Sequence, residues 1–281
     1  MEMTFEDAAQ LQIGTRAHIL DNGKPLNIAP GVNLEVETLD TTSGELNIDC
    51  GLFKVGDKTV LVVTGSTPRD YIDYNFRPFG ILRTKGIKKS DSTAEYKQEF
   101  DELLAGLALP ANDLHFGFLL LAARVLWFVK KNRTAIGTDK PDFIVGHSLG
   151  AAACQILGAA LDVPTICFAS PQVVKRKAIS GDDNPFRASA HSQWKIFNVV
   201  WKKDFVTRGY RALRYRSLGH REVLEMHENY RVKLKLAKPK LPIHHFMADY
   251  LSLLKIDRAK PYQQVSMKWW DGTRPIPPEA P

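Results

Sequence analysis

Apolar and polar residues alternate with the period of a β-strand in two early segments of the chain. Residues 33–39 (NLEVETL) and 46–53 (LNIDCGLF) show this alternation, which is typical of strands with one buried face. Other segments are almost continuously apolar and predict strands that are buried on both faces: 59–65 (TVLVVTG), 143–145 (FIV), 164–171 (PTICFASP) and 194–201 (WKIFNVVW). These runs predict the centre of a mostly parallel sheet.

Helical periodicity appears between these strands. We expect helices over 93–107, with Ser92 as the N-cap, and over 113–131, because apolar residues recur there on one face: Phe100, Leu103, Leu104 and Leu107, then Phe116, Leu120, Ala123 and Trp127. Residues 5–22 are weakly helical, and 244–256 predict a last helix. Residues 211–224 predict a hairpin or an extended arm, and the Pro-rich segment 268–281 an irregular tail. The alternation of strands and helices predicts one three-layer α/β domain over 1–281.

Residues 141–153 (PDFIVGHSLGAAA) join a buried strand, the motif G-x-S-x-G and an alanine-rich helix. This order is that of a nucleophile elbow, in which a tight turn holds the serine, here Ser148, in a strained conformation. Gly146 and Gly150 lack side chains that would collide in such a turn. The motif therefore predicts a nucleophilic serine, against the plainer alternative of an ordinary strand-to-helix turn.

Composition narrows the classes of function. The chain has 281 residues and a formal net charge of +7, which suits an anionic surface but is small for a dedicated nucleic-acid binder. We therefore expect no nucleic-acid partner. Three scattered cysteines, Cys50, Cys154 and Cys167, lack metal-ligand spacing and predict buried thiols. The first residues, MEMTFEDAAQ, contain no apolar signal region, so we expect a cytoplasmic protein.

A nucleophilic serine needs a histidine as general base and a carboxylate that orients this histidine. In the α/β-hydrolase arrangement the chain order is Ser, Asp or Glu, then His. Asp204 directly follows the strand at 194–201, whereas Asp182 and Asp183 follow no strand and Asp162 is too close to the elbow helix. Position in the chain does not distinguish the histidines downstream: His220, His227, His244 and His245.

Several separated segments resemble the class 3 lipases, the fungal triacylglycerol lipase type of α/β-hydrolase. IVGHSLGAAA is similar to that family's TGHSLGGA elbow, and VLVVTGST to the strand that ends in RGT. Further similar segments follow in family order: DYIDYNF, LHFGFLLLA, CFASPQVV, KDFVTR, which is similar to the family's DPVPR, and HFMADYL, which is similar to H-x-M-x-x-Y-L. The resemblance extends from about residue 59 to 251. It implies a three-layer α/β-hydrolase fold and ester hydrolysis.

The resemblance also implies roles for particular residues. By this resemblance Ser148 is the nucleophile, Asp204 the acid and His245 the base. His245 is preferred to His244 because Met247 and Tyr250 then fall at the family's offsets from the histidine. The oxyanion donors are the backbone N–H of Leu149 and Ser66, at the end of the RGT-like strand. His115 and His147 match structural positions. No metal or organic cofactor is expected for this chemistry.

The resemblance further implies a lid over residues 68–89, where aromatic residues lie near basic ones. We expect an acyl-ester lipid as substrate and peripheral contact with an anionic lipid surface. Four residues depart from the family pattern: Thr64, Gln172, Val174 and Ser217. Two alternatives stay open: acyl transfer or thioester cleavage by the same triad, and a catalytically silent fold that binds through the basic residues 202–240.

Overall fold

The structure is a computed structural model. It describes residues 2–3, 5–20, 36–42, 48–65, 95–179, 195–201, 204, 206–207, 215–224, 247, 250 and 267–268. The predicted lid and the residues Ser66, His227, His244 and His245 lie outside the described residues, as do Asp182 and Asp183.

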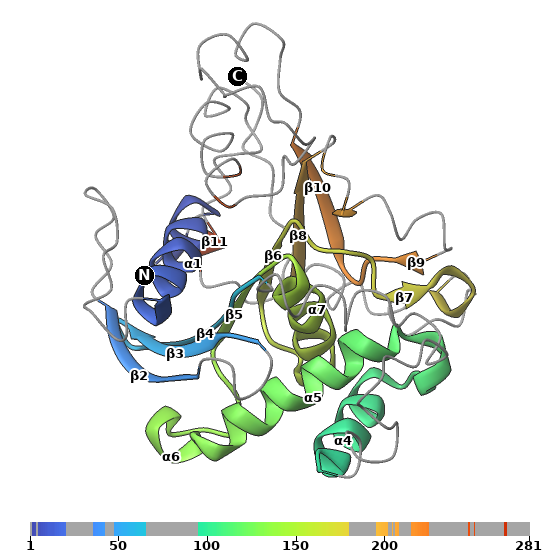
Figure 1. Cartoon of the computed structure of the whole chain (residues 1–281), viewed down its shortest axis with the longest axis horizontal. Helices are drawn as coiled ribbons and strands as arrows, with labels where there is room; N and C mark the ends of the chain where they lie inside the picture. Colours follow the sequence, from blue (N-terminus) through green and yellow to red (C-terminus); the bar gives the residue numbers. More distant parts are fainter. Residues whose placement is uncertain are drawn as a thin grey trace, which may run out of the picture.

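A seven-stranded sheet forms the centre of the fold (Figure 1), in the order β10-β8-β6-β5-β4-β3-β2. Its strands are β2 (Val36–Thr42), β3 (Cys50–Val55), β4 (Lys58–Val63), β5 (Phe143–His147), β6 (Thr165–Phe168), β8 (Ile196–Trp201) and β10 (His220–Leu224). The pairs from β4 through β5, β6 and β8 to β10 are parallel, whereas β2, β3 and β4 pair antiparallel. The continuously apolar segments are thus central strands, as predicted.

Strand β10 corrects the prediction for residues 211–224. We expected a hairpin or an extended arm, but His220–Leu224 pairs in parallel with β8 and forms one edge of the central sheet. The short strand β9 (Tyr215–Arg216) pairs instead with β7 (Val174–Lys175). The sequence HREVL has few apolar residues, and an edge strand needs less apolar character than a central one.

Helices cover both faces of the sheet and make the fold three-layered (Figure 1). On one face α4 (Lys97–Leu107), α5 (Phe116–Lys131) and α7 (Leu149–Leu161) pack over Leu61 and Val63. On the other face α1 (Phe5–Leu20) packs over Val60 and Val62. The alternation of these four residues along β4 supplies apolar side chains to two separate cores.

The helix boundaries differ in part from the predicted ones. Helix α4 begins at Lys97 rather than at 93, and Tyr96 occupies its N-cap position without a side-chain capping bond, so Ser92 does not cap it. Helix α5 begins at Phe116 because a 3₁₀ turn, η1 (Ala111–Asp113), precedes it and His115 caps it. The short helix α6 (Arg133–Ile136) follows α5, and the 3₁₀ turn η2 (Arg176–Ile179) follows β7.

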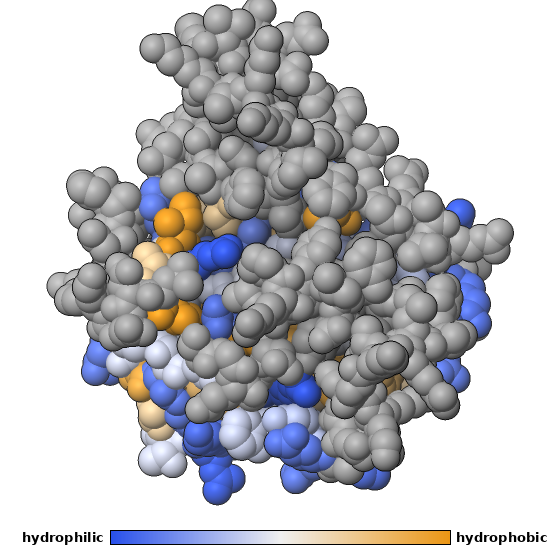
Figure 2. Space-filling view, viewed as in Figure 1, coloured by the Kyte–Doolittle hydropathy of each residue, from blue (hydrophilic) through white to orange (hydrophobic). Residues whose placement is uncertain are grey.

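The two ends of the described chain meet in a small antiparallel pair, β1 (Glu2–Met3) with β11 (Met267–Lys268). Lys268 therefore belongs to a strand and not to the irregular tail that we predicted from residue 268. None of the described helices combines the length and the apolar character needed to cross a bilayer. The described surface on the face shown in Figure 2 is mainly hydrophilic, with smaller apolar areas.

Candidate active site

The predicted nucleophile occupies a strained turn between β5 and α7. Ser148 has a φ of 54° and a ψ of −121°, a conformation that residues other than glycine rarely adopt. Such strain costs about 1–3 kcal/mol and persists only where the surrounding structure imposes it. Here the Ser148 N–H donates to the Phe168 carbonyl of β6 (2.9 Å), and the Ser148 carbonyl accepts from the Ala152 N–H (3.2 Å). The turn has the backbone strain of a nucleophile elbow, as the motif predicted.

Both glycines of the motif are required by close backbone contacts. A Cβ on Gly146 would lie 2.7 Å from the Ala151 Cα, and one on Gly150 would lie 2.3 Å from the Thr64 carbonyl oxygen. Gly65, just after β4, is also restricted, because its Cβ would lie 2.7 Å from the His147 Nδ1 and 3.2 Å from the Ser148 Cβ. The end of β4 is therefore in direct contact with the elbow.

The first turn of α7 provides a positive electrostatic environment beside Ser148. Leu149 is the first residue of this 13-residue helix and is buried. N–H groups in the first turn of a helix have no acceptor within the helix, and the helix dipole makes this end positive. The backbone N–H of Leu149, which the sequence predicts as an oxyanion donor, therefore lies at this positive helix end, directly after Ser148.

The predicted acid is a buried carboxylate with defined partners. Asp204 follows β8 and is fully buried. Its Oδ1 accepts from the Val206 N–H (2.9 Å) and its Oδ2 from the Tyr250 hydroxyl (2.8 Å). Its backbone carbonyl accepts from the Thr207 hydroxyl (3.0 Å). A carboxylate has about four acceptor positions, so this one can accept an imidazole N–H in addition to these two donors.

Tyr250 connects the acid to the strands beside the elbow. Its hydroxyl accepts from the Trp201 N–H at the end of β8 (2.9 Å) while it donates to Asp204. Its ring packs edge-on against Phe168 of β6 at 6.3 Å, and this is the residue whose carbonyl binds the Ser148 N–H. The motif identified Tyr250 only as an offset from a histidine. Its contact with the acid was not predicted.

Ser148 and Asp204 both lie at the carboxyl-terminal ends of the parallel strands. Strands β5 and β8 are parallel and are separated only by β6, and each residue follows the carboxyl end of its strand. With two interstrand spacings between them, the two strand ends are about 10 Å apart. Of the remaining predicted site residues, Leu149 lies beside Ser148, whereas Ser66 and His245 are outside the described residues.

Two rival residues lie at the opposite, amino-terminal ends of the parallel strands. His220 pairs with Phe197 near the beginning of β8, about 13 Å of strand away from the end that precedes Asp204. Asp162 caps the far end of α7 and forms an ion pair with Lys195. Neither can join a triad with Ser148, so the structure excludes both.

The histidines predicted to be structural have local partners. The His115 Nδ1 accepts from the Phe118 N–H at the start of α5 (3.4 Å), and the two rings stack at 3.8 Å. His147 is buried at the end of β5, against Gly65. Thr64, which stands where the class 3 lipase pattern has an arginine, donates its hydroxyl to the Asp49 carbonyl (3.0 Å) and so holds the end of β4.

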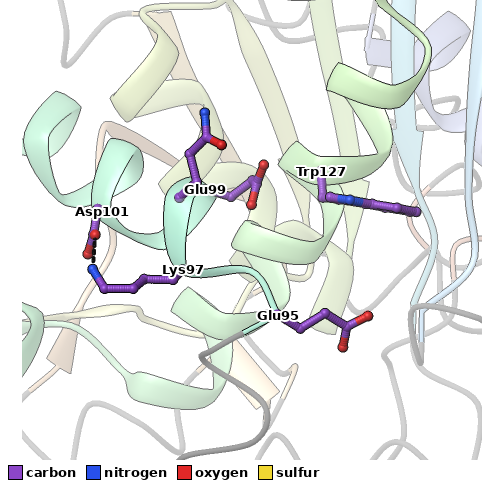
Figure 3. Close-up of a pocket in the computed structure, with 6 residues that line it drawn as sticks. Glu95, Lys97, Glu99, Asp101 and Trp127 are labelled. Carbon is purple, nitrogen blue, oxygen red and sulfur yellow. Dashed lines mark hydrogen bonds and ion pairs between the residues drawn. The ribbon is translucent and has the colours of Figure 1, made fainter.

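A separate surface pocket of about 670 Å³ lies away from these residues, between the beginning of α4 and the second half of α5 (Figure 3). Its lining is mainly charged: Glu95, Lys97, Gln98, Glu99, Asp101 and Trp127. Within it Lys97 forms an ion pair with Asp101, and Glu99 contacts Lys130 at 3.6 Å. Neither Ser148 nor Asp204 lines this pocket, so it is distinct from the predicted site.

No family model matches the chain, and no curated protein matches its sequence. Solved structures do match. The Lip2 lipase from Yarrowia lipolytica aligns with a TM-score of 0.52 and 15% identity, over 78% of each chain. A structure described as a fungal lipase aligns with a TM-score of 0.50 and 13% identity, over 80% of each chain. At these identities the likeness concerns the fold. The predicted fold class is therefore confirmed: the chain has the α/β-hydrolase fold of fungal lipases.

Proposed function

We propose that this protein is a serine carboxylester hydrolase of the lipase or esterase type, with Ser148, Asp204 and His245 as its triad. The observation that carries the proposal is the strained Ser148 elbow. It lies at the same end of the parallel strands as the buried Asp204 carboxylate, in a fold like that of fungal lipases. A strained serine backbone is retained only where the fold imposes it, and such strain is concentrated at functional sites.

His245 is proposed as the base from the residues that follow it. Met247 and Tyr250, two and five positions later, are buried, and the Tyr250 hydroxyl donates to Asp204. The chain spans at most about 7 Å over two residues, so a base two positions before Met247 is compatible with this arrangement. An imidazole can bridge a serine and a carboxylate that extend from strand ends about 10 Å apart.

The proposed reaction proceeds in two steps. His245 takes the hydroxyl proton as Ser148 Oγ attacks the acyl carbon, and the Leu149 N–H and Ser66 bind the negative charge on the tetrahedral oxygen. Collapse releases the alcohol, which takes the proton from His245, and leaves an acyl-enzyme. Water activated by His245 then hydrolyses this ester and restores Ser148. Every proton passes through the triad, so the scheme needs no cofactor.

Activity on a p-nitrophenyl ester and labelling by a fluorophosphonate test this proposal. Ser148→Ala should abolish both, and His245→Ala should lower kcat by at least about 10³-fold. His244→Ala is the matched control and should retain activity. A wild-type chain that neither hydrolyses the ester nor reacts with the probe would support the catalytically silent alternative and refute the proposal.

The proposed substrate is an acyl-ester lipid, presented at an anionic surface. Support comes from the lipase neighbours, the net charge of +7 and the aromatic and basic composition of residues 68–89. Vesicle cosedimentation tests the surface contact. Binding should be stronger to vesicles with phosphatidylserine than to phosphatidylcholine alone and should weaken with salt. Equal binding to the two kinds of vesicle would refute the contact with an anionic surface but would leave the proposal of ester hydrolysis untouched.

A further inference from the structure

Helix α1 places a buried amide against the end of β4. The Gln12 side chain is only 2% exposed, and its Nε2 donates to the Val63 carbonyl (3.0 Å). Its Oε1 is also buried and accepts no hydrogen bond from the described residues. The preceding positions that face the sheet are apolar or small, among them Ala8 and Leu11. An amide with only one of its polar atoms bonded is costly in such a core, so its role calls for an explanation other than packing.

The acceptor of this hydrogen bond occupies a sensitive position. Val63 is the last residue of β4, two positions before Gly65, which contacts Ser148, and three before Ser66, the proposed oxyanion donor. The Ser148 N–H donates to the Phe168 carbonyl of β6, on the side of β5 that faces away from β4. The helix thus supplies a donor to the end of β4 from outside the sheet.

Three sets of contacts hold this strand end. On the side of β3, the Thr64 N–H and hydroxyl both donate to the Asp49 carbonyl (2.9 and 3.0 Å). On the side of α7, Gly150 lies so close that a Cβ there would be 2.6 Å from the Val63 carbonyl oxygen. On the side of α1, Gln12 binds that same oxygen. The strand end is restrained from both neighbouring layers as well as from the adjacent strand.

We propose that Gln12 is a positioning residue that fixes the end of β4, residues 63–65, relative to Ser148, and this inference rests on the proposed function, in which Ser66 directly follows this strand end. An oxyanion donor must lie about 2.7–3.1 Å from the developing charge. A displacement near 1 Å at a catalytic group can lower the rate by about 10²-fold. Loss of one of three restraints should displace the end of β4 by less than about 1 Å. We therefore expect kcat to fall by about tenfold with little change in KM.

Gln12→Met tests this proposal because methionine has a similar length and lacks the donor. Thr15→Val is the matched control: Thr15 is a buried polar residue of the same helix, but its hydroxyl donates to Leu11 of α1 itself (2.8 Å) and not to the sheet. Gln12→Leu is a second variant with a different packing shape. For each we would measure kcat and KM on a p-nitrophenyl ester, the rate of fluorophosphonate labelling, and the thermal unfolding midpoint.

The expected result is a folded Gln12→Met or Gln12→Leu protein with kcat and labelling rate about tenfold lower than those of Thr15→Val, at an unchanged KM. A folded Gln12 variant as active as Thr15→Val would overturn the positioning role. Failure of both Gln12 variants to fold, while Thr15→Val folds, would assign Gln12 to stability and overturn it too. Activity of the wild type and its loss in Ser148→Ala establish the proposed function independently of these outcomes.

Discussion

Replacement of Tyr250 by phenylalanine isolates the link between the acid and the core. The substitution keeps the ring that packs against Phe168 and removes only the hydroxyl. That hydroxyl donates to Asp204 Oδ2 (2.8 Å) and accepts from the Trp201 N–H (2.9 Å), and Tyr250 and Asp204 are fully buried. The change therefore deletes two hydrogen bonds at once without opening a large cavity.

The expected loss of stability follows from these two bonds. A hydrogen bond to a charged group contributes about 1.5–3 kcal/mol, and a buried N–H left without an acceptor costs about 1–3 kcal/mol. Because the contributions of neighbouring bonds are not additive, we expect the free energy of unfolding to fall by about 3 kcal/mol. For a chain of this size that corresponds to a midpoint lower by about 6–12 °C. The loosened carboxylate should also lower kcat by about tenfold, because it no longer fixes the proposed base.

Thermal unfolding and ester hydrolysis would be measured on the same preparations. Tyr96→Phe is the matched control, since the Tyr96 hydroxyl donates to Glu95 (3.0 Å), away from the predicted site. The free energy of unfolding of this variant should stay within about 1 kcal/mol of the wild-type value, and its kcat should be unchanged. A Tyr250→Phe protein with wild-type midpoint and kcat would refute the reasoning about this hydroxyl. Lower stability with an unchanged kcat would instead argue against Asp204 as the acid.

Two further predictions concern the elbow and the thiols. Gly150→Ala should lower the free energy of unfolding by about 2–3 kcal/mol and reduce activity, because its Cβ would lie 2.3 Å from the Thr64 carbonyl oxygen. Gly137→Ala, with a φ of 76° but open space around it, should cost only about 1 kcal/mol and keep activity; equal unfolding midpoints for the two variants would contradict this contrast. Burial raises the pKa of Cys50, Cys154 and Cys167, so a thiol-disulfide reagent at pH 8 should modify none of them until the chain unfolds. Since the folded chain keeps these protons, stability should be complete below the ordinary pKa of 9.0 and fall as the pH rises above it; rapid modification or a midpoint that rises there would count against this reading.

The central strands and the elbow could be predicted because their signals are local. Gly146 and Gly150 flank Ser148 within five residues, and the apolar runs of β4 and β5 are long enough to identify buried strands. Asp204 could be chosen because an acid that follows a strand end needs no information from distant parts of the chain. The base could be chosen only through the family resemblance, and its role stays a proposal, as do the lid, the lipid surface and the cytoplasmic location.

Features that depend on distant contacts could not be predicted. Helix α1 showed only weak helical periodicity because it is buried on most sides, so the polar face that normally identifies a helix is narrow. The Gln12 bond to Val63 joins residues 51 positions apart, and the Tyr250 bond to Asp204 joins residues 46 apart. Sequence periodicity reports which face of an element is buried, but it does not report which buried polar atoms meet.

The burial of α1 also has a consequence for the order in which the chain acquires its structure during synthesis on the ribosome. The strands that pack on this helix include β6, which ends at Phe168, 148 residues (168 − 20) beyond the end of α1. At about 5–20 residues per second, translation of that interval takes roughly 7–30 s. During this delay the apolar side of the nascent α1 can pack on β4 but not on β5 and β6, so part of it stays exposed, and we expect the early translation product to bind chaperones.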